Sequence, residues 1–329
     1  MIKVIKPGMQ TSVQDYPGRV GYWDIGIPPS GTMDDLALRT GNSLLGNPEG
    51  TAGLEMTTIG AHLLFTQATQ IVLTGASMPA SLDGQALSFY EVIQVPENAL
   101  LEIGNCQSTG MRSYLCVLGG IDVPDYLGSK STFPFGQFGG YEGRALKAGD
   151  SLKIGTAHHN PSKQSCPESL RPTFTNTWEI KAILGPHAAP DYFTKESENM
   201  FFSTHWEVHY QSNRLGFRLL GPEPEFTRET GGEGGRHPSN LHDYVYSVGS
   251  INFTGNMPII LSQDGPSLGG FVCIATIASA EKWKLGQLRP KDRILFHKIT
   301  HKTALELKKE QITHLHSLSP SSEKVALHS

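Results

Sequence analysis

The chain has 329 residues, among them 36 glycines and 21 prolines, and a formal net charge of −4. This length is enough for a sizeable core and suggests two domains, and the slightly acidic balance argues against nucleic acid or an anionic membrane as the main partner. The first ten residues, MIKVIKPGMQ, lack the apolar stretch of a signal peptide, and no apolar run approaches the roughly 20 residues of a membrane span. We therefore expect a cytoplasmic protein.

Most of the predicted elements are strands. Short runs rich in β-branched and aromatic residues, bounded by Gly, Pro, Asn or Asp, recur along the chain at the spacing typical of sandwiches and barrels. These runs are QIVLTGA (70–76), ALLEIGN (99–105), MRSYLCVLGG (111–120), WEVHY (206–210), NMPIILS (256–262), FVCIATI (271–277) and DRILFHKI (292–299). The pattern predicts a mostly β protein with a few helices.

Two segments have the signals of helices. In residues 30–47, SGTMDDLALRTGNSLLGN, Ser30 or Thr32 is a possible N-cap, acidic residues follow, and Gly46 is a stop signal. In residues 194–203, TKESENMFFS, Thr194 is the predicted N-cap. The C-terminal segment begins as a weak amphipathic helix and becomes polar.

One segment is a natural linker. Residues 156 to 176 contain three prolines and show no apolar periodicity. We therefore predict an N-terminal β-barrel lobe over 1–156, a linker over 157–176, a C-terminal β-barrel lobe over 177–300 and a polar tail over 301–329.

Neither the cysteines nor the histidines have metal-binding spacing. The four cysteines form no CxxC pair, and Cys116 and Cys273 lie in apolar runs, where a thiol usually behaves as a small hydrophobe. In GGRHPSNLHDYVY (234–246), His237, His242 and Asp243 are acceptable ligands for zinc or iron, but the two histidines are five residues apart. Pro238 also disfavours a helix there, so we predict a polar loop and no bound metal.

Seven long motifs, in order, resemble the carboxyltransferase module of urea carboxylase. They are similar to the KipA-like, or allophanate hydrolase subunit 2, family, which also includes a subunit of bacterial 5-oxoprolinase. The motifs are TSVQDYPGRVGYWDIGIPPSGTMDDLALRTGNSLLGNPEGTAGLE, YLCVLGGIDVPDYLGSKSTF, GQFGGYEGRALKAGD, WEVHYQSNRLGFRLLGPEP, HPSNLHD, DGPSLGGFVC and KLGQLRP. The resemblance covers residues 1 to about 300. One departure is Lys291, where the family usually has glycine.

The resemblance implies a fold of two cyclophilin-like β-barrel lobes and a biotin-dependent carboxyl transfer. The carboxyl group would pass from carboxybiotin, carried on a partner protein or domain, to urea, giving allophanate. The implied partners are a KipI-like subunit, a biotin carboxylase and a biotin carrier protein, which we expect to be separate chains. Two alternatives stay open: a component like the related subunit of 5-oxoprolinase, and a KipA-like protein that binds a KipI-like partner without catalysis.

Such chemistry asks for a particular kind of site. A urea N–H is too weak an acid for a side chain to deprotonate outright, so fixed donors, carboxylate acceptors and the exclusion of water have to do the work. In HPSNLHDY we interpret Asn240, His242 and Asp243 as the wall of a substrate pocket. The alternative is a loop held by Asx-turn hydrogen bonds, with no ligand.

A second glycine-rich segment, SQDGPSLGG (262–270), is the other half of the predicted site. Asp264 would accept hydrogen bonds from the substrate, while Gly269 and Gly270 would let backbone N–H groups converge on an anion. The alternative is a tight turn between strands. We expect Asp264 and Asn240 to meet in one pocket, and we expect Asp264→Ala to leave folding intact, because loop carboxylates rarely hold a core.

The remaining candidates have equally good structural interpretations. Asn213 and Arg214 would bind a carboxylate or carboxybiotin, or else form a salt-bridged barrel corner. The same alternatives apply to Arg112, and His237 is a further candidate for substrate binding. Glu55, in an apolar context, is predicted to be either paired or functional.

Overall fold

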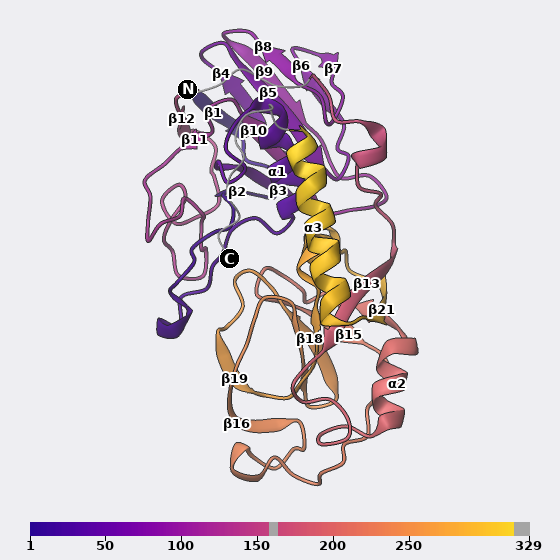
Figure 1. Cartoon of the computed structure of the whole chain (residues 1–329). Helices are drawn as coiled ribbons and strands as arrows, with labels where there is room; N and C mark the ends of the chain where they lie inside the picture. The colour runs from indigo at the N-terminus through magenta and orange to yellow at the C-terminus, as the bar shows by residue number, and fades with distance from the viewer. Residues whose placement is uncertain (158–163, 319–329) are drawn as a thin grey trace.

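The computed structural model describes residues 1–157 and 164–318, which form two β-rich lobes and a long helix that runs along both (Figure 1). The first lobe contains two sheets. The seven-stranded sheet has the order β11 (Ile121–Asp122), β12 (Ser151–Ile154), β1 (Ile2–Lys6), β4 (His62–Phe65), β9 (Ala99–Ile103), β6 (Ala80–Leu82) and β7 (Gln85–Ala86). The five-stranded sheet has the order β2 (Gln10–Gln14), β3 (Gly53–Thr57), β10 (Arg112–Val117), β5 (Thr69–Gly75) and β8 (Ile93–Val95).

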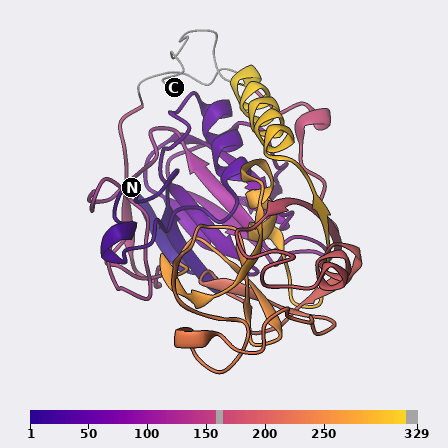
Figure 2. The ribbon, with the colours of Figure 1, turned by 60° about the horizontal axis from the view of Figure 1, so that its bottom comes forward.

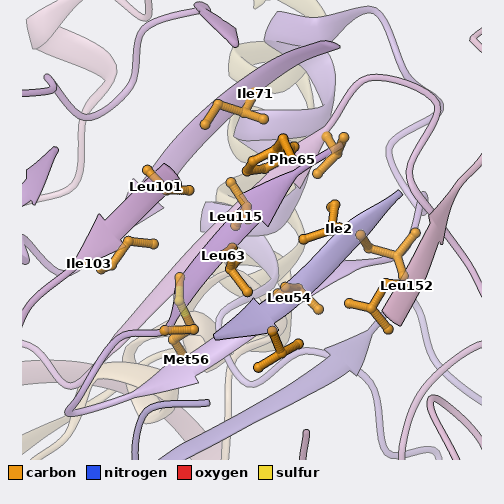
Figure 3. Packing of buried hydrophobic residues seen from close by; sticks show 14 of the residues in the cluster. Ile2, Leu54, Met56, Leu63, Phe65, Ile71, Leu101, Ile103, Leu115 and Leu152 are labelled. Carbon is orange, nitrogen blue, oxygen red and sulfur yellow. The ribbon is translucent and has the colours of Figure 1, made fainter. Parts of the chain in front are cut away.

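Aliphatic side chains from both sheets make the core of the first lobe. On β9 the buried residues alternate, as expected of a strand with one covered face. Figure 3 shows Leu101 and Leu63 from the larger sheet beside Leu54 and Leu115 from the smaller one, all fully buried. Burial of this apolar surface is the main force that holds the two sheets together.

The second lobe is a closed barrel. Its strand order is β13 (Thr177–Leu184), β20 (Cys273–Ile277), β17 (Ser250–Thr254), β18 (Met257–Leu261), β15 (Gly216–Leu220), β14 (His205–Val208) and β21 (Arg293–Lys298). Aromatic residues fill it, among them Trp206, Phe253 and Phe296. A separate two-stranded ribbon pairs β16 (Asn240–Val245) with β19 (Leu268–Phe271). The predicted mostly β fold is confirmed.

The two predicted helices are present. α1 (Asp35–Leu45) packs on β5 and β10 and ends at Gly46, but its N-cap is Asp34, whose Oδ1 accepts a hydrogen bond from the N–H of Ala37 at 2.9 Å. The prediction of Ser30 or Thr32 as the cap is therefore wrong. α2 (Lys195–Ser203) begins after Thr194 as predicted. Short 3-10 helices are η1 (Trp23–Ile25), η2 (Glu168–Leu170), η3 (Gly232–Gly234) and η4 (Ser279–Gln287).

The third helix confirms the predicted helical start of the C-terminal segment and extends it to Leu318. α3 (His301–Leu318) buries Leu315 and Leu318 and packs against α1 and η4, so it joins the second lobe to the first (Figures 1 and 2). Residues 319–329 lie outside the described chain. No helix among the described residues is long and apolar enough to cross a membrane.

The predicted linker is not simply extended chain. Cys166 is buried in the first lobe, and its N–H donates to the carbonyl oxygen of Tyr90 at 2.9 Å. Residues 158–163 of the linker lie outside the described chain. The loop predicted over HPSNLHDY is also corrected, because Asn240–Val245 is a strand.

Candidate functional site

A pocket of about 320 Å³ lies where the two lobes meet. Four of the predicted site residues line it: Arg112 from the first lobe, and Asn213, Arg214 and Asp264 from the second. The other lining residues are Met9, Gln10, Thr57, Met111, Pro134, Phe135, Ser212 and Leu215. The fold therefore brings together predicted residues that are up to 152 positions apart, counted from Arg112 to Asp264.

Arg214 and Asp264 form a buried, bidentate ion pair on the pocket floor. The Nε of Arg214 donates to Oδ2 of Asp264 at 2.8 Å, and Nη2 donates to Oδ1 at 3.1 Å. Nη2 also donates to the carbonyl oxygen of Gly31 in the first lobe at 2.7 Å. Burial alone would lower the pKa of Arg214, but the carboxylates of Asp264 and Glu55 raise it above its ordinary value. This guanidinium is therefore permanently charged.

The first lobe contributes a second carboxylate and a second guanidinium. Oε1 of Glu55 on β3 accepts from Nη1 of Arg214 at 2.8 Å and lies 3.5 Å from Nε of Arg112 on β10. Oε2 of Glu55 accepts from the hydroxyl of Tyr114 at 2.8 Å. Glu55 is thus paired, which is one of the two roles predicted from the sequence. Its partner Arg214 lies in the other lobe.

Next to the pocket, Asp34 of the first lobe and Gln287 of the second form hydrogen bonds that hold the two lobes together. The Nε2 of Gln287 on η4 donates to Oδ2 of Asp34 at 2.6 Å, while its Oε1 accepts from the N–H groups of Met111 and Arg112 at 2.9 and 3.1 Å. Burial raises the pKa of Asp34 to about 7, although the hydrogen bonds from Gln287 and Ala37 favour the carboxylate. One buried amide therefore positions the backbone of Arg112.

A larger hollow of about 610 Å³ lies in the first lobe, lined in part by Asp15, Asp122 and Lys130. Its buried carboxylate is fully engaged: Asp15 accepts from the hydroxyls of Ser129 and Ser131 and from the N–H of Lys130. No unpaired buried donor among the described residues lines this hollow. The pocket between the lobes is therefore the better candidate.

Comparison with known proteins gives the family. Residues 25–298 match the model of the carboxyltransferase domain, subdomains A and B. The chain belongs to this carboxyltransferase domain family. It is 49% identical to the urea amidolyase of Saccharomyces cerevisiae over 323 residues, which are 96% of this chain and 18% of that protein. It is 33% identical to a subunit of the 5-oxoprolinase of Escherichia coli, over 97% of this chain and 98% of that protein.

A solved structure agrees with the sequence comparisons. The urea carboxylase of Kluyveromyces lactis superimposes with a TM-score of 0.93 and 45% identity, over 97% of this chain and 29% of that chain. The carboxyltransferase domain thus spans less than a third of the length of these large relatives. This match establishes the family and the fold of the present chain.

The other half of the predicted site does not reach the pocket of the carboxyltransferase domain. Asn240, His242 and Asp243 lie on β16, at the end of the second lobe that points away from the first (Figure 1), and they are not among the described residues that line the pocket. The expected meeting of Asp264 and Asn240 in one pocket is therefore wrong. The polar sequence of β16 reflects its exposure, since His242 and Asp243 are both exposed.

The neighbouring candidate residues, His237, Gly269 and Gly270, have structural contacts in or beside the ribbon of β16 and β19. His237 uses Nδ1 to bond the hydroxyl and the N–H of Ser239, at 2.8 and 3.1 Å, which is a local turn. Gly269 and Gly270 lie on β19, where an added Cβ would meet the ring of Tyr246 at 2.7 Å and the carbonyl oxygen of Leu241 at 2.8 Å. These two glycines permit close packing; they do not present converging N–H groups.

Sequence reasoning missed the apolar part of the pocket. Met9, Phe135 and Leu215 are exposed hydrophobic residues, and Phe135 is 80% exposed. Exposed apolar side chains beside a polar pocket floor are a typical signal of ligand binding. The signal becomes visible only in three dimensions, because the FPF segment alone (133–135) is indistinguishable from a core strand.

Two further observations concern expectations from the sequence. Cys116 and Cys273 are buried in strands, as predicted, and no disulfide joins any of the four cysteines, all of which lie in the described part of the chain. Among the described residues, no three His, Cys, Asp or Glu side chains are grouped so that they could hold a metal ion. Lys291 has φ +73°, a left-handed conformation that explains why glycine is usual at this position in the family.

Proposed function

We propose that this chain transfers a carboxyl group from carboxybiotin to urea, giving allophanate, in the pocket between the lobes. The observation that carries the proposal is Arg112: it lines the pocket, and its Nη2 is not enclosed and has no hydrogen-bond partner among the described residues. Such a donor is held ready for an oxygen atom of a ligand. The 45–49% identity to relatives named urea amidolyase and urea carboxylase supports urea as the acceptor.

The pocket fits the head group of carboxybiotin. Its volume of about 320 Å³ is at the small end of the range for ligand sites. The apolar rim of Met9, Phe135 and Leu215 suits the thioether ring and the aliphatic arm of biotin, and the floor offers guanidinium and amide donors. Carboxybiotin, when bound, supplies the carboxyl group.

The side chains of the pocket bind and orient the reactants. Each oxygen of Asp264 already accepts one hydrogen bond from Arg214, and a carboxylate has about four acceptor positions, so Asp264 retains capacity for two urea N–H groups. Arg112 donates from Nη2 to the oxygen on which negative charge develops. Asn213 uses Oδ1 to accept from the N–H of Leu215 at 2.8 Å, which leaves its amide NH₂ to donate to a ligand.

Exclusion of water is the second task of the site. Charged hydrogen bonds are strongest where water is absent, and the carboxyl group must reach urea and not a water molecule. The exposed ring of Phe135 is placed to cover a ligand that enters from the rim. The polar floor beneath is closed by the ion pair of Arg214 with Glu55 of the first lobe and by its ion pair with Asp264 of the second lobe.

The proposal includes three partners: a biotin carboxylase, a biotinylated carrier and a KipI-like subunit. The test is reconstitution of this chain with all three, followed by measurement of ATP hydrolysis that depends on urea and of allophanate formed. We expect both signals, and we expect Arg112→Met to lower them by about 10- to 150-fold, the equivalent of one charged hydrogen bond. A complete mixture that turns over ATP without consuming urea would contradict the proposal.

A second candidate is a role like that of the related 5-oxoprolinase subunit. The observation that favours it is the match to nearly the whole of that relative, 98% of its length at 33% identity. The same mixture, supplied with 5-oxoproline in place of urea, separates the two candidates. Activity with 5-oxoproline alone would select the second.

A further inference from the structure

The carboxylate of Glu55 is placed between the two arginines of the pocket, although Glu55 itself does not line the pocket. Its side chain is 2% exposed, and its Oε1 accepts from Arg214 of the second lobe at 2.8 Å while lying 3.5 Å from Nε of Arg112. Oε2 accepts from the N–H of Met33 and the hydroxyl of Tyr114, each at 2.8 Å. Four neighbours therefore fix the position of this carboxylate.

Arg214 uses four of its five N–H groups in these contacts. Asp264 takes hydrogen bonds from Nε and Nη2, Gly31 takes one from Nη2, and Glu55 takes one from Nη1. A ligand could gain more than one hydrogen bond from Arg214 only by displacing one of these partners. Displacement is costly, because it leaves a buried charge without its partner.

Arg112 is different. Its Nη1 donates to the carbonyl oxygen of Gly286 at 2.8 Å, but Nε is buried with no hydrogen bond among the described residues, since the 3.5 Å approach to Glu55 does not meet hydrogen-bond geometry. The cluster contains two guanidinium groups and two carboxylates, Glu55 and Asp264, so its formal charges cancel. Arg112, with no hydrogen bond from Nε or Nη2 among the described residues, therefore keeps more donors for a ligand than Arg214, which keeps one.

We propose that Glu55 is a positioning residue that neutralises Arg214 and leaves Arg112 as the main anion-binding group of the pocket. The pocket then admits one acidic group, and a second ligand bound at the same time has to be neutral. If the proposed function holds, the acidic group is the carboxyl of carboxybiotin and the neutral ligand is urea. The charge balance set by Glu55 thus selects a neutral amide over an acceptor that carries its own carboxylate.

The test measures binding of formate, a small carboxylate, by isothermal titration of the full chain. We expect one weak site in the wild type and loss of that site in Arg112→Met. Glu55→Gln keeps the shape of the side chain and removes the charge that opposes anion binding. We expect it to tighten formate binding about tenfold, because the neutral amide removes the repulsion between the carboxylate and the bound anion, which the two neighbouring guanidinium groups partly screen.

The matched control is Glu198→Gln. Glu198 on α2 is also 2% exposed and also bridges two cations, Lys195 at 2.6 Å and Lys298 at 2.9 Å, but it is not among the residues that line the pocket. We expect this variant to bind formate like the wild type. A purely structural role for Glu55 would lower the melting temperature of Glu55→Gln without tightening formate binding.

Two results would overturn the proposal: formate binding that is unchanged or weaker in folded Glu55→Gln, or formate binding that survives in Arg112→Met. The second measurement does not need Glu55→Gln to fold. Formate binding is also independent of which nitrogen compound accepts the carboxyl group. A failed urea assay with the expected formate pattern would therefore reject only the proposed function, and the reverse pattern would reject only the role of Glu55.

Discussion

Two glycine-flanked segments of the second lobe look alike in sequence and differ in structure. Residues 262–265 bring Asp264 to the pocket between the lobes, 5% exposed and paired with Arg214. Residues 237–243 lead into β16, whose His242 and Asp243 face solvent at the far end of the lobe. Both segments offer carboxylates and donors next to glycines, and only one of them contributes to the candidate site.

The difference comes from which strands the segments extend. β15 and β18 pair with Gly216 opposite Leu261, and the chains leaving this pair stay together: the N–H of Asp264 donates to the carbonyl oxygen of Arg214 at 2.9 Å. The register of this antiparallel strand pair thus places Asp264 beside Arg214. Among the described strands, β16 pairs only with β19. No strand pairing therefore brings its side chains to the interface between the lobes. Strand register, more than local composition, decides which polar loop becomes part of a site.

The largest expected effect is that of Asp264→Ala. The sequence predicted intact folding, but the structure makes Asp264 the bidentate partner of a buried guanidinium. Removing one member of a buried pair costs about 3–5 kcal/mol, so we expect a clear loss of stability in urea denaturation. Carboxyl transfer by the reconstituted complex should also fall by at least the 10- to 150-fold of a lost charged hydrogen bond.

Asp264→Asn is the control for this prediction. The amide keeps the size of the side chain and one acceptor, so it should recover part of the stability while transfer stays low. Normal stability and normal transfer in Asp264→Ala would contradict the contrast between residues 262–265 and 237–243, because they would show that the pocket floor tolerates an unpaired Arg214.

The next effect concerns His187, which fastens the ribbon to the barrel. Its ring contacts that of Tyr244 on β16, with centroids 4.4 Å apart, and its Nδ1 accepts from the N–H of Cys273 at 3.0 Å. Burial, with a smaller contribution from the cation of Arg228, lowers the pKa of His187 to about 4. The unfolded chain therefore binds this proton more readily than the folded one, with a pKa near 6.5.

Stability from His187 is fully present above about pH 6.5 and is lost as the pH falls toward 4, by roughly 3 kcal/mol at most. We expect the protection factors of the amides in β16 and β19, which correct for the slower intrinsic exchange at low pH, to fall over this range before those of the first lobe do. His187→Gln retains an acceptor for Cys273 and does not titrate. A pH profile of the ribbon that is the same in this variant as in the wild type would assign the acid sensitivity to another group.

The sequence predicted well what local patterns determine. The strands around Cys116 and Cys273, and the helix after Thr194, follow from periodicity and capping signals within a few residues. The sequence did not predict the strand β16, because polar and apolar residues are mixed on both of its faces and no clear alternation marks it. Its pairing with β19 is a tertiary effect.

The candidate site was predictable only in part, for a similar reason. An acidic residue in an apolar run, such as Glu55, is recognisable as paired or functional. Its partner Arg214 lies 159 residues away, and nothing in either segment identifies the other. Resemblance to a family narrowed the candidates to a few segments, and the packing of the two lobes determined which of them meet.

The smallest expected effect is that of Asn240→Ala, and it is the sharpest test of the comparison. The carbonyl oxygen of Asn240 accepts from Arg228, and its N–H donates to the carbonyl oxygen of His237 at 2.9 Å. Both contacts belong to the backbone and survive in alanine. We therefore expect a change in stability within about 0.5 kcal/mol, typical of surface positions, and transfer within about twofold of the wild type. The measurements are thermal unfolding and transfer by the reconstituted complex.

The double variant with Asp264→Asn should be additive, because the two residues share no contact. A tenfold loss of transfer with unchanged stability, or strong coupling in the double variant, would show that the ribbon closes over the pocket when substrate binds.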